Sequence, residues 1–186
     1  MQHLGEGIYY VENFFPLHKK LKEKIEIECN KVVFLDYESK EIPYGIMNKS
    51  GYFLIKKDSP LHDLVLELNL KIQLEIELFL NKKYISQWKN TENVGVVGRC
   101  PTGESLADHA DKVHLSDEYY SYSSVYYLNG DYEGGKLFFP EKNIGIKPKE
   151  NSVVFLPSHF IHRAEEVVSG VKIALPTFFK EIKNAN

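Results

Sequence analysis

The sequence predicts an α+β fold in which N-terminal helices pack on one side of an antiparallel β-sandwich or barrel. The 186 residues, 43% of them hydrophobic, suffice for one domain with a substantial core. Lys/Glu/Leu-rich segments with helical character fill about the first 90 residues, and short aromatic and β-branched runs follow them. We therefore expect a single domain over residues 1–186. It should have a helical part at about 1–90 and a double-stranded β-helix (jelly-roll) core at about 91–180.

The first predicted helix covers residues 16–31. Leu17, Leu21, Ile25 and Cys29 recur at four-residue intervals, which places them on one helical face. Lys and Glu occupy the remaining positions, as expected for a face in contact with water.

The second predicted helix, over residues 59–83, rests on length and composition. Residues 66–80 also alternate apolar with polar side chains, which is a strand pattern. A strand of that length would be unusual, whereas Leu, Glu, Lys and Gln favour helix. Ser59 is a suitable N-cap and Pro60 a suitable first helical residue, so we predict a helix.

Strands are predicted in the second half of the chain, where apolar runs end at turn residues. Asn129-Gly130-Asp131 and Gly134-Gly135 supply two of these turns. The predicted strands cover residues 94–99, 121–128, 136–139, 152–156 and 171–179.

Composition and charge argue against several classes of protein, although a local basic groove stays possible. A net charge of -3 gives no overall attraction to nucleic acid or to a membrane surface. The two cysteines, Cys29 and Cys100, form no paired-ligand motif and no disulfide framework, which is typical of reduced thiols. The sequence shows neither a signal peptide nor a run of about 18 apolar residues, so a cytoplasmic location is expected.

The stretch Asp108-His109-Ala110-Asp111 carries the most chemical information. Residues two apart in an extended segment project to the same side, so His109 and Asp111 can share one ion. His162, 51 residues after Asp111, supplies a second imidazole. Two His and one carboxylate form the facial triad of non-haem iron(II) oxygenases, in which the other metal positions stay open. His-x-Asp alone is frequent by chance, so the order of the surrounding motifs decides whether it indicates a metal site.

These motifs follow one another in a specific order. After His109-x-Asp111 come Tyr127-Leu128-Asn129, Gly134-Gly135, Phe139-Pro140, Pro148-Lys149, the run 152–157, His162 and, ten residues later, Lys172. This order resembles that of the prolyl 4-hydroxylase-like branch of the 2-oxoglutarate/iron(II) oxygenase superfamily. The resemblance covers roughly residues 94–179, under half of the chain.

The resemblance implies a role for each matching residue. His109, Asp111 and His162 correspond to the iron ligands. Lys172 corresponds to the cation that pairs with the distal carboxylate of 2-oxoglutarate. Tyr127 corresponds to a tyrosine that hydrogen-bonds the same carboxylate, and Leu137 to an apolar residue beside the cosubstrate.

The resemblance also implies Fe(II), 2-oxoglutarate and dioxygen as cofactors, and it leaves ascorbate open as a further one. Hydroxylation of a substrate C–H bond would yield succinate and CO2 as co-products. A peptide or protein substrate hydroxylated at proline is the first expectation. A free amino acid or other small molecule is the alternative, as is a non-catalytic cupin-like metal-binding or interaction module. No nucleic-acid or membrane partner is expected, and the sequence leaves the oligomeric state open.

Neighbouring residues have competing interpretations. His114 and His159 flank the triad but would break its spacing, so both are expected to be structural or loop residues. Arg163 either reaches the substrate or lies outside the barrel. Arg99 either meets the substrate or is a solvated charge, and the second interpretation is favoured.

The chain departs from the family pattern at three places. Leu106 and Leu137 stand where many members have Tyr and Thr, and Tyr120 or a neighbour replaces an Arg. These departures concern contacts with substrate and cosubstrate rather than the metal ligands. Most of the tyrosines between residues 119 and 127 are expected to pack in the core. The loop 112–122 is a candidate lid.

Overall fold

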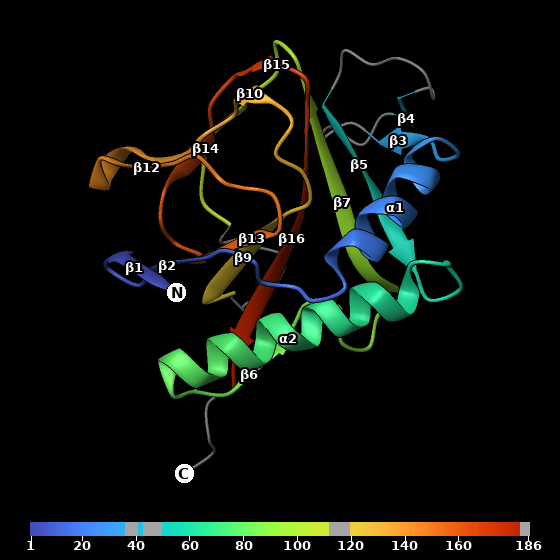
Figure 1. Cartoon of the computed structure of the whole chain (residues 1–186). Helices are drawn as coiled ribbons and strands as arrows, with labels where there is room; N and C mark the ends of the chain where they lie inside the picture. Colours follow the sequence, from blue (N-terminus) through green and yellow to red (C-terminus); the bar gives the residue numbers. More distant parts are fainter. Residues whose placement is uncertain (36–40, 43–49, 112–119, 183–186) are drawn as a thin grey trace.

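Antiparallel strands dominate the computed structural model, which describes residues 1–35, 41–42, 50–111 and 120–182 (Figure 1). The strands of the major sheet, given in spatial order, are β1 (Gln2–Gly5), β2 (Ile8–Val11), β13 (Ser152–Pro157), β9 (Tyr122–Tyr127), β16 (Val171–Glu181), β7 (Asn93–Pro101), β5 (Gly51–Lys56), β3 (Phe34–Leu35) and β4 (Glu41–Ile42). A further strand, β6 (Tyr84–Ser86), pairs with the C-terminal part of β16.

A minor sheet lies against part of the major one. Its strands, in spatial order, are β12 (Ile144–Ile146), β11 (Leu137–Phe139), β14 (His162–Ala164) and β8 (Leu106–His109). A two-stranded ribbon of β10 (Glu133–Gly134) and β15 (Val167–Ser169) accompanies it, and one 3-10 turn, Pro140–Lys142, connects β11 to β12. The two facing sheets form the jelly-roll core that the sequence predicts.

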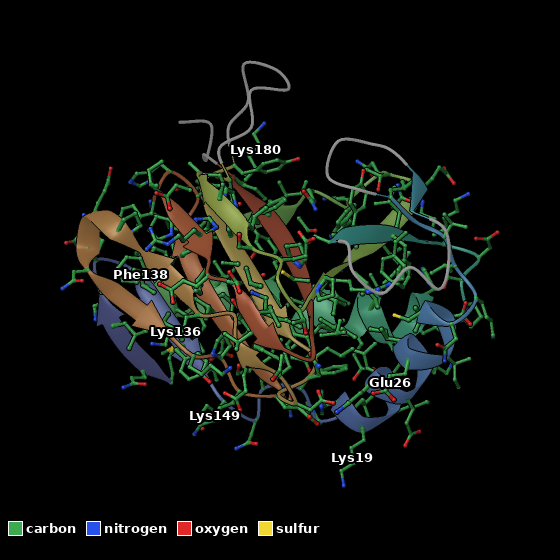
Figure 2. All side chains as sticks on the ribbon, turned by 90° about the horizontal axis from the view of Figure 1, so that it is seen from above. Lys19, Glu26, Lys136, Phe138, Lys149 and Lys180 are labelled. Carbon is green, nitrogen blue, oxygen red and sulfur yellow. The ribbon has the colours of Figure 1, made fainter. Side chains whose placement is uncertain are left out.

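Both helices, α1 (His18–Cys29) and α2 (His62–Leu80), lie on the other face of the major sheet. Figure 1 shows α2 running across the strands, with α1 beside it. In Figure 2, α1 (marked by Lys19 and Glu26) and β11 (marked by Phe138) lie on opposite sides of the molecule. The helices therefore support the major sheet and leave the space between the sheets free for a site.

Strand alternation divides the core into two layers. Along β13, Val153 and Phe155 pack in the cluster shared with the helices, whereas Val154 and Leu156 face the minor sheet. All four are fully buried. A strand buried on both faces reads as a continuous apolar run, which is why this segment is recognisable in the sequence.

All five predicted strands are confirmed, to within a few residues at their ends, as β7, β9, β11, β13 and β16. Both predicted helices are also confirmed, although each is shorter than its predicted range. Neither helix combines the length and the apolar character that a membrane crossing requires, within the described residues.

The predicted start of the second helix is wrong in detail. Its N-cap is Leu61 rather than Ser59, and the helix begins at His62. The Ser59 hydroxyl accepts the backbone N–H of Leu61 at 3.2 Å, so Ser59 and Pro60 form a turn that leads into the helix.

The description of residues 1–90 as helical is also only partly right. Six strands, β1 to β6, precede residue 90, and five of them belong to the continuous order of the major sheet. Most have two to four residues, too few for a periodic pattern to stand out. The longest, β5, alternates buried and exposed side chains, but it follows a segment without clear periodicity.

Candidate active site

Two strands of the minor sheet bring the predicted metal ligands together. His109 ends β8 and His162 begins β14, and the antiparallel register pairs these two residues directly. Their ring centroids lie 4.3 Å apart. Asp111 follows β8 by two residues, so its side chain returns to the same side as His109.

The three side chains converge on one point. Nε2 of His109 lies 3.6 Å from Oδ1 of Asp111, and Nε2 of His162 lies 3.7 Å from Oδ2. One ligand atom from each residue lies within 4.8 Å of the other two. Metal–ligand bonds are about 2.1 Å long, so one ion can contact all three.

Backbone carbonyls set the tautomer of both imidazoles. Nδ1 of His109 is 2.8 Å from the carbonyl oxygen of Ala107, and Nδ1 of His162 is 3.0 Å from that of Phe160. A carbonyl only accepts, so Nδ1 carries the proton and donates it. The Nε2 lone pairs are thereby directed toward Asp111, as in histidines that ligate a metal.

Burial supports a metal at this point. Oδ2 of Asp111 is buried and has no hydrogen-bond partner among the described residues. Such an oxygen is costly unless a cation satisfies it. Burial also lowers the pKa of His162, which favours the neutral imidazole that binds metals. The donor set therefore fits a divalent transition metal with open positions.

A cavity of about 300 Å³ extends from the triad between the sheets. Lys172 on β16 lines the same cavity and is 7% exposed. The ammonium donates to the carbonyl of Gly135 at 3.2 Å. Burial lowers the pKa of Lys172, because an ammonium is poorly solvated there.

Tyr127 and Leu137 line the same cavity, both buried, from β9 and β11. The Tyr127 hydroxyl has no protein partner among the described residues. Burial raises the pKa of this phenol well above its ordinary value, so it remains an O–H donor. A buried cation and a buried donor in one cavity can recognise a carboxylate.

The Gly134-Gly135 turn shapes the cavity beside Lys172. Gly134 has φ +74°, and a Cβ there would lie 2.2 Å from the carbonyl oxygen of Glu166. Only glycine fits such an approach. The turn brings the Gly135 carbonyl to Lys172 and directs the chain into β11, which carries Leu137.

Arg163 lies outside the cavity. Its guanidinium is 3.3 Å from Asp108 and stacks on the Phe138 ring at 4.5 Å. Of the two interpretations, the surface position is therefore the one observed. Asp108 precedes His109 and Arg163 follows His162. Their ion pair therefore links β8 to β14 beside the triad.

The interpretation of Arg99 as a solvated charge is wrong. Arg99 is 9% exposed, contributes to the cavity wall, and places its guanidinium over the Phe34 ring at 4.9 Å. A charged side chain is usually expected in solvent, and the sequence alone does not show that β3 and β5 lie beside Arg99. Cys100, which pairs with Lys172 across β7 and β16, lines the cavity as well. No motif in the sequence marks this cysteine as a site residue.

The remaining predictions near the site have mixed outcomes. His159 is exposed in a turn, contacts the Phe160 ring edge to face and is not part of the metal-ligand cluster, as expected. His114, Tyr119 and most of the candidate lid fall outside the described residues. Tyr122 and Tyr126 pack in the core, as the interpretation of the tyrosine run predicts, whereas Tyr120 is only half-buried.

A cavity between two facing sheets, lined by a His-Asp-His cluster and a buried cation, is the arrangement expected of a jelly-roll metalloenzyme. Comparison with known families is specific for this part of the chain. Residues 96–180 match the model of the 2OG-Fe(II) oxygenase superfamily. A search among curated proteins found no match.

Solved prolyl hydroxylases share the fold. A prolyl hydroxylase from Trichoplax adhaerens, solved with a hypoxia-inducible-factor peptide fragment, aligns with a TM-score of 0.71 at 15% identity over 94% of this chain and 84% of that one. A Pseudomonas putida prolyl-4-hydroxylase aligns at 0.69 and 17%, over 95% and 93%. The viral collagen prolyl hydroxylase of Paramecium Bursaria Chlorella virus-1 aligns at 0.62 and 20%, over 96% and 98%.

Residues 96–180 thus match the model of the 2OG-Fe(II) oxygenase superfamily, and the chain has the fold of solved prolyl hydroxylases. The match supports a dioxygenase that uses Fe(II), 2-oxoglutarate and dioxygen, and the His109, Asp111 and His162 cluster could hold the iron.

Proposed function

We propose that the chain is a prolyl 4-hydroxylase-like enzyme that hydroxylates peptidyl proline with Fe(II) and 2-oxoglutarate, releasing succinate and CO2. The observation that carries the proposal is one cavity lined by two chemically different groups. One is an unsatisfied carboxylate oxygen with two oriented imidazoles. The other is a buried ammonium with a buried phenol hydroxyl, within the described residues.

The proposed roles follow from these positions. His109, Asp111 and His162 hold the iron, with Nε2, a carboxylate oxygen and Nε2 as ligand atoms. Bound there, iron with 2-oxoglutarate and dioxygen supplies the oxidising power that converts C–H to C–OH. Ascorbate is a candidate reductant in the assay.

Lys172 and Tyr127 would hold the distal carboxylate of 2-oxoglutarate. Lys172 offers a point charge and Tyr127 a directed O–H, and together they offset the desolvation of the carboxylate. Leu137 would pack against the aliphatic part of the cosubstrate. Lysine is less directional than arginine, so Tyr127 carries much of the orientation.

The open side of the site favours a compact apolar substrate group. The His109 side chain is 34% exposed, whereas those of Asp111 and His162 are 8% and 5% exposed, so His109 marks the mouth. Val125, Pro176 and Phe178 line the wall beyond it. Such a wall excludes water and suits a pyrrolidine ring better than a charged free amino acid.

The first experiment is anaerobic binding of Fe(II) and 2-oxoglutarate, followed by the weak visible metal-to-ligand charge-transfer band. The wild-type chain should show the band, and His162→Ala should not. His159→Ala is the matched control, because that imidazole is exposed and is not part of the metal-ligand cluster, and it should behave as wild type. A wild-type chain that binds neither ligand would leave only a binding or interaction module.

The second experiment identifies the substrate. Succinate formation should rise when a proline-containing peptide is added, and mass spectrometry should find one added oxygen on proline. Free proline at the same concentration should stimulate much less. Stimulation by the free amino acid, or by another small molecule alone, would reject the peptide substrate while leaving the dioxygenase activity intact.

A further inference from the structure

Tyr132, the residue before β10, carries a buried hydroxyl that the proposed function does not use. The residue is 3% exposed, and its oxygen has no hydrogen-bond partner in the part of the chain that the structure describes. Leaving a buried O–H donor unpaired is unfavourable. Oδ2 of Asp111 is unpaired in the same way, and a cation at the triad would satisfy it. The Tyr132 hydroxyl requires an acceptor instead.

The contacts of its ring place Tyr132 beside the cavity. The ring packs with Cys100 and Val167 in a small cluster, and Cys100 lines the cavity. A Cβ built on Gly135 would lie 3.0 Å from Cε2 of Tyr132 and 3.4 Å from Cδ of Lys172. Cε2 is bonded to the carbon that carries the hydroxyl, so the polar end of this ring adjoins the side chain of Lys172.

Electrostatic effects connect the Tyr132 hydroxyl to other polar groups of the cavity. Burial raises the pKa of Tyr132, and the neighbouring Tyr10 and Cys100 raise it further. Burial also raises the pKa of Tyr127, and among its neighbours Tyr132 adds most to that shift. Both phenols therefore keep their protons at neutral pH and can donate to an anion.

Lys147 holds Tyr132 in place without using its hydroxyl. The ammonium donates to the backbone carbonyls of Tyr132 at 2.9 Å and Gly134 at 2.7 Å, and it lies 4.3 Å from the centroid of the Tyr132 ring. These contacts fix the backbone and one face of the ring. A donor that is already positioned loses little conformational freedom when a ligand binds.

We propose that the Tyr132 hydroxyl is a third donor to the distal carboxylate of 2-oxoglutarate, beside Lys172 and Tyr127. This inference rests on the proposed function, because it requires that this carboxylate enters the cavity. A carboxylate has two oxygens with about four acceptor positions, so one lysine and one phenol leave room for another donor. The carboxylate supplies the acceptor that Tyr132 lacks within the described residues.

Tyr132→Phe tests the inference, because it removes the hydroxyl and keeps the ring. Anaerobic titration of the Fe(II)-loaded chain should show at least about a 10-fold loss of affinity for 2-oxoglutarate, as expected for a hydrogen bond to a charged group. 2-Oxopentanoate has the same five-carbon chain with a methyl group in place of the distal carboxylate. Wild type and variant should bind it equally, and an equal loss with both ligands would overturn the inference.

The stability of the chain without ligands separates a binding role from a structural one. Because the hydroxyl is unpaired without an acceptor, Tyr132→Phe should leave the thermal midpoint unchanged or raise it. Tyr126→Phe is the matched control, since that buried hydroxyl contacts Asn151 at 2.9 Å and His18 at 2.7 Å on the helix side of the major sheet. The control should lower the midpoint and leave 2-oxoglutarate affinity unchanged.

The outcomes distinguish this inference from the function on which it rests. A wild-type chain that gives no charge-transfer band with Fe(II) and 2-oxoglutarate would overturn both. A wild-type chain that binds 2-oxoglutarate no better than Tyr132→Phe does would overturn only the role of Tyr132. A lower midpoint in Tyr132→Phe together with unchanged affinity would assign the hydroxyl to the stability of the fold instead.

Discussion

Lys172 combines two properties that oppose each other. An ammonium only 7% exposed is poorly solvated, and in the described structure it donates to one carbonyl, that of Gly135. The cost of burying it is offset when an anion enters the cavity. A lysine in such a position is better explained by the ligand it receives than by the stability of the empty fold.

Replacing Lys172 with methionine should weaken 2-oxoglutarate binding strongly. The substitution keeps the apolar stem but removes a charged hydrogen bond worth about 1.5–3 kcal/mol, which corresponds to roughly a 10- to 150-fold loss of affinity. Titration calorimetry or the charge-transfer band would measure it. Lys172→Arg should recover part of the affinity, because it restores the charge. Equal affinity in wild type and Lys172→Met would remove Lys172 from the cosubstrate site.

The direction of the Lys172 pKa shift adds a pH signature. Burial lowers this pKa below the ordinary 10.5, so the ammonium loses its proton at a lower pH than a solvated lysine. Affinity for 2-oxoglutarate should therefore fall with rising pH before 10.5 is reached. Lys172→Arg should show no such decline, since arginine stays charged throughout. A decline that persists unchanged in Lys172→Arg would assign it to another group.

At the scale of elements, α2 meets β7 through a glycine. A Cβ added at Gly95 would lie 2.6 Å from Cγ1 of Val65, a branched side chain with little freedom to move. The close contact lets the helix lie directly on the strand, and α2 in turn supports the face of the sheet opposite the site.

Gly95→Ala should consequently destabilise the protein by about 1–3 kcal/mol through overpacking. Chemical unfolding would measure the change. The double variant Gly95→Ala/Val65→Ala should lose less stability than the sum of its single variants, because removing the valine methyls makes room for the new one. Additive losses would mean that the two residues do not compete for the same space.

Whether a strand or helix could be predicted from the sequence depended on the length and composition of its segment. The run at 152–156 was predicted as a strand because burial on both faces gives an uninterrupted apolar run. Residues 8–11 and 51–56 were missed, because four to six residues of mixed polarity do not define a period. The three metal ligands, His109, Asp111 and His162, could be predicted from their spacing, because the order of motifs along the chain does not depend on exact strand lengths. The burial of Arg99 was not accessible, because it depends on which strands cover it.

At the scale of the whole molecule, the site ties distant parts of the chain together. The triad comes from the minor sheet, whereas Lys172 and Tyr127 come from the major sheet. Ligands that contact both sheets bind the folded chain and not the unfolded one, so they stabilise the fold by mass action.

Fe(II) with 2-oxoglutarate should therefore raise the unfolding temperature under anaerobic conditions. At ligand concentrations 100 times the dissociation constant the gain is about 2.7 kcal/mol, or roughly 5–10 °C for a chain of this size. Differential scanning fluorimetry would detect it. His162→Ala should show little shift with the same ligands, and a full shift in that variant would place the stabilising ligand elsewhere.

The position of β1 and β2 bears on how the family-matching segment would behave alone. β2 pairs with β13, a strand in which every residue is buried. A chain trimmed to residues 96–180 would lack β2 and would leave the backbone N–H and C=O groups of β13 unpaired along an apolar edge. Exposed apolar edges recruit other strands and lead to aggregation. The N-terminal hairpin thus covers this edge, so residues outside the family-matching segment protect that segment from aggregation.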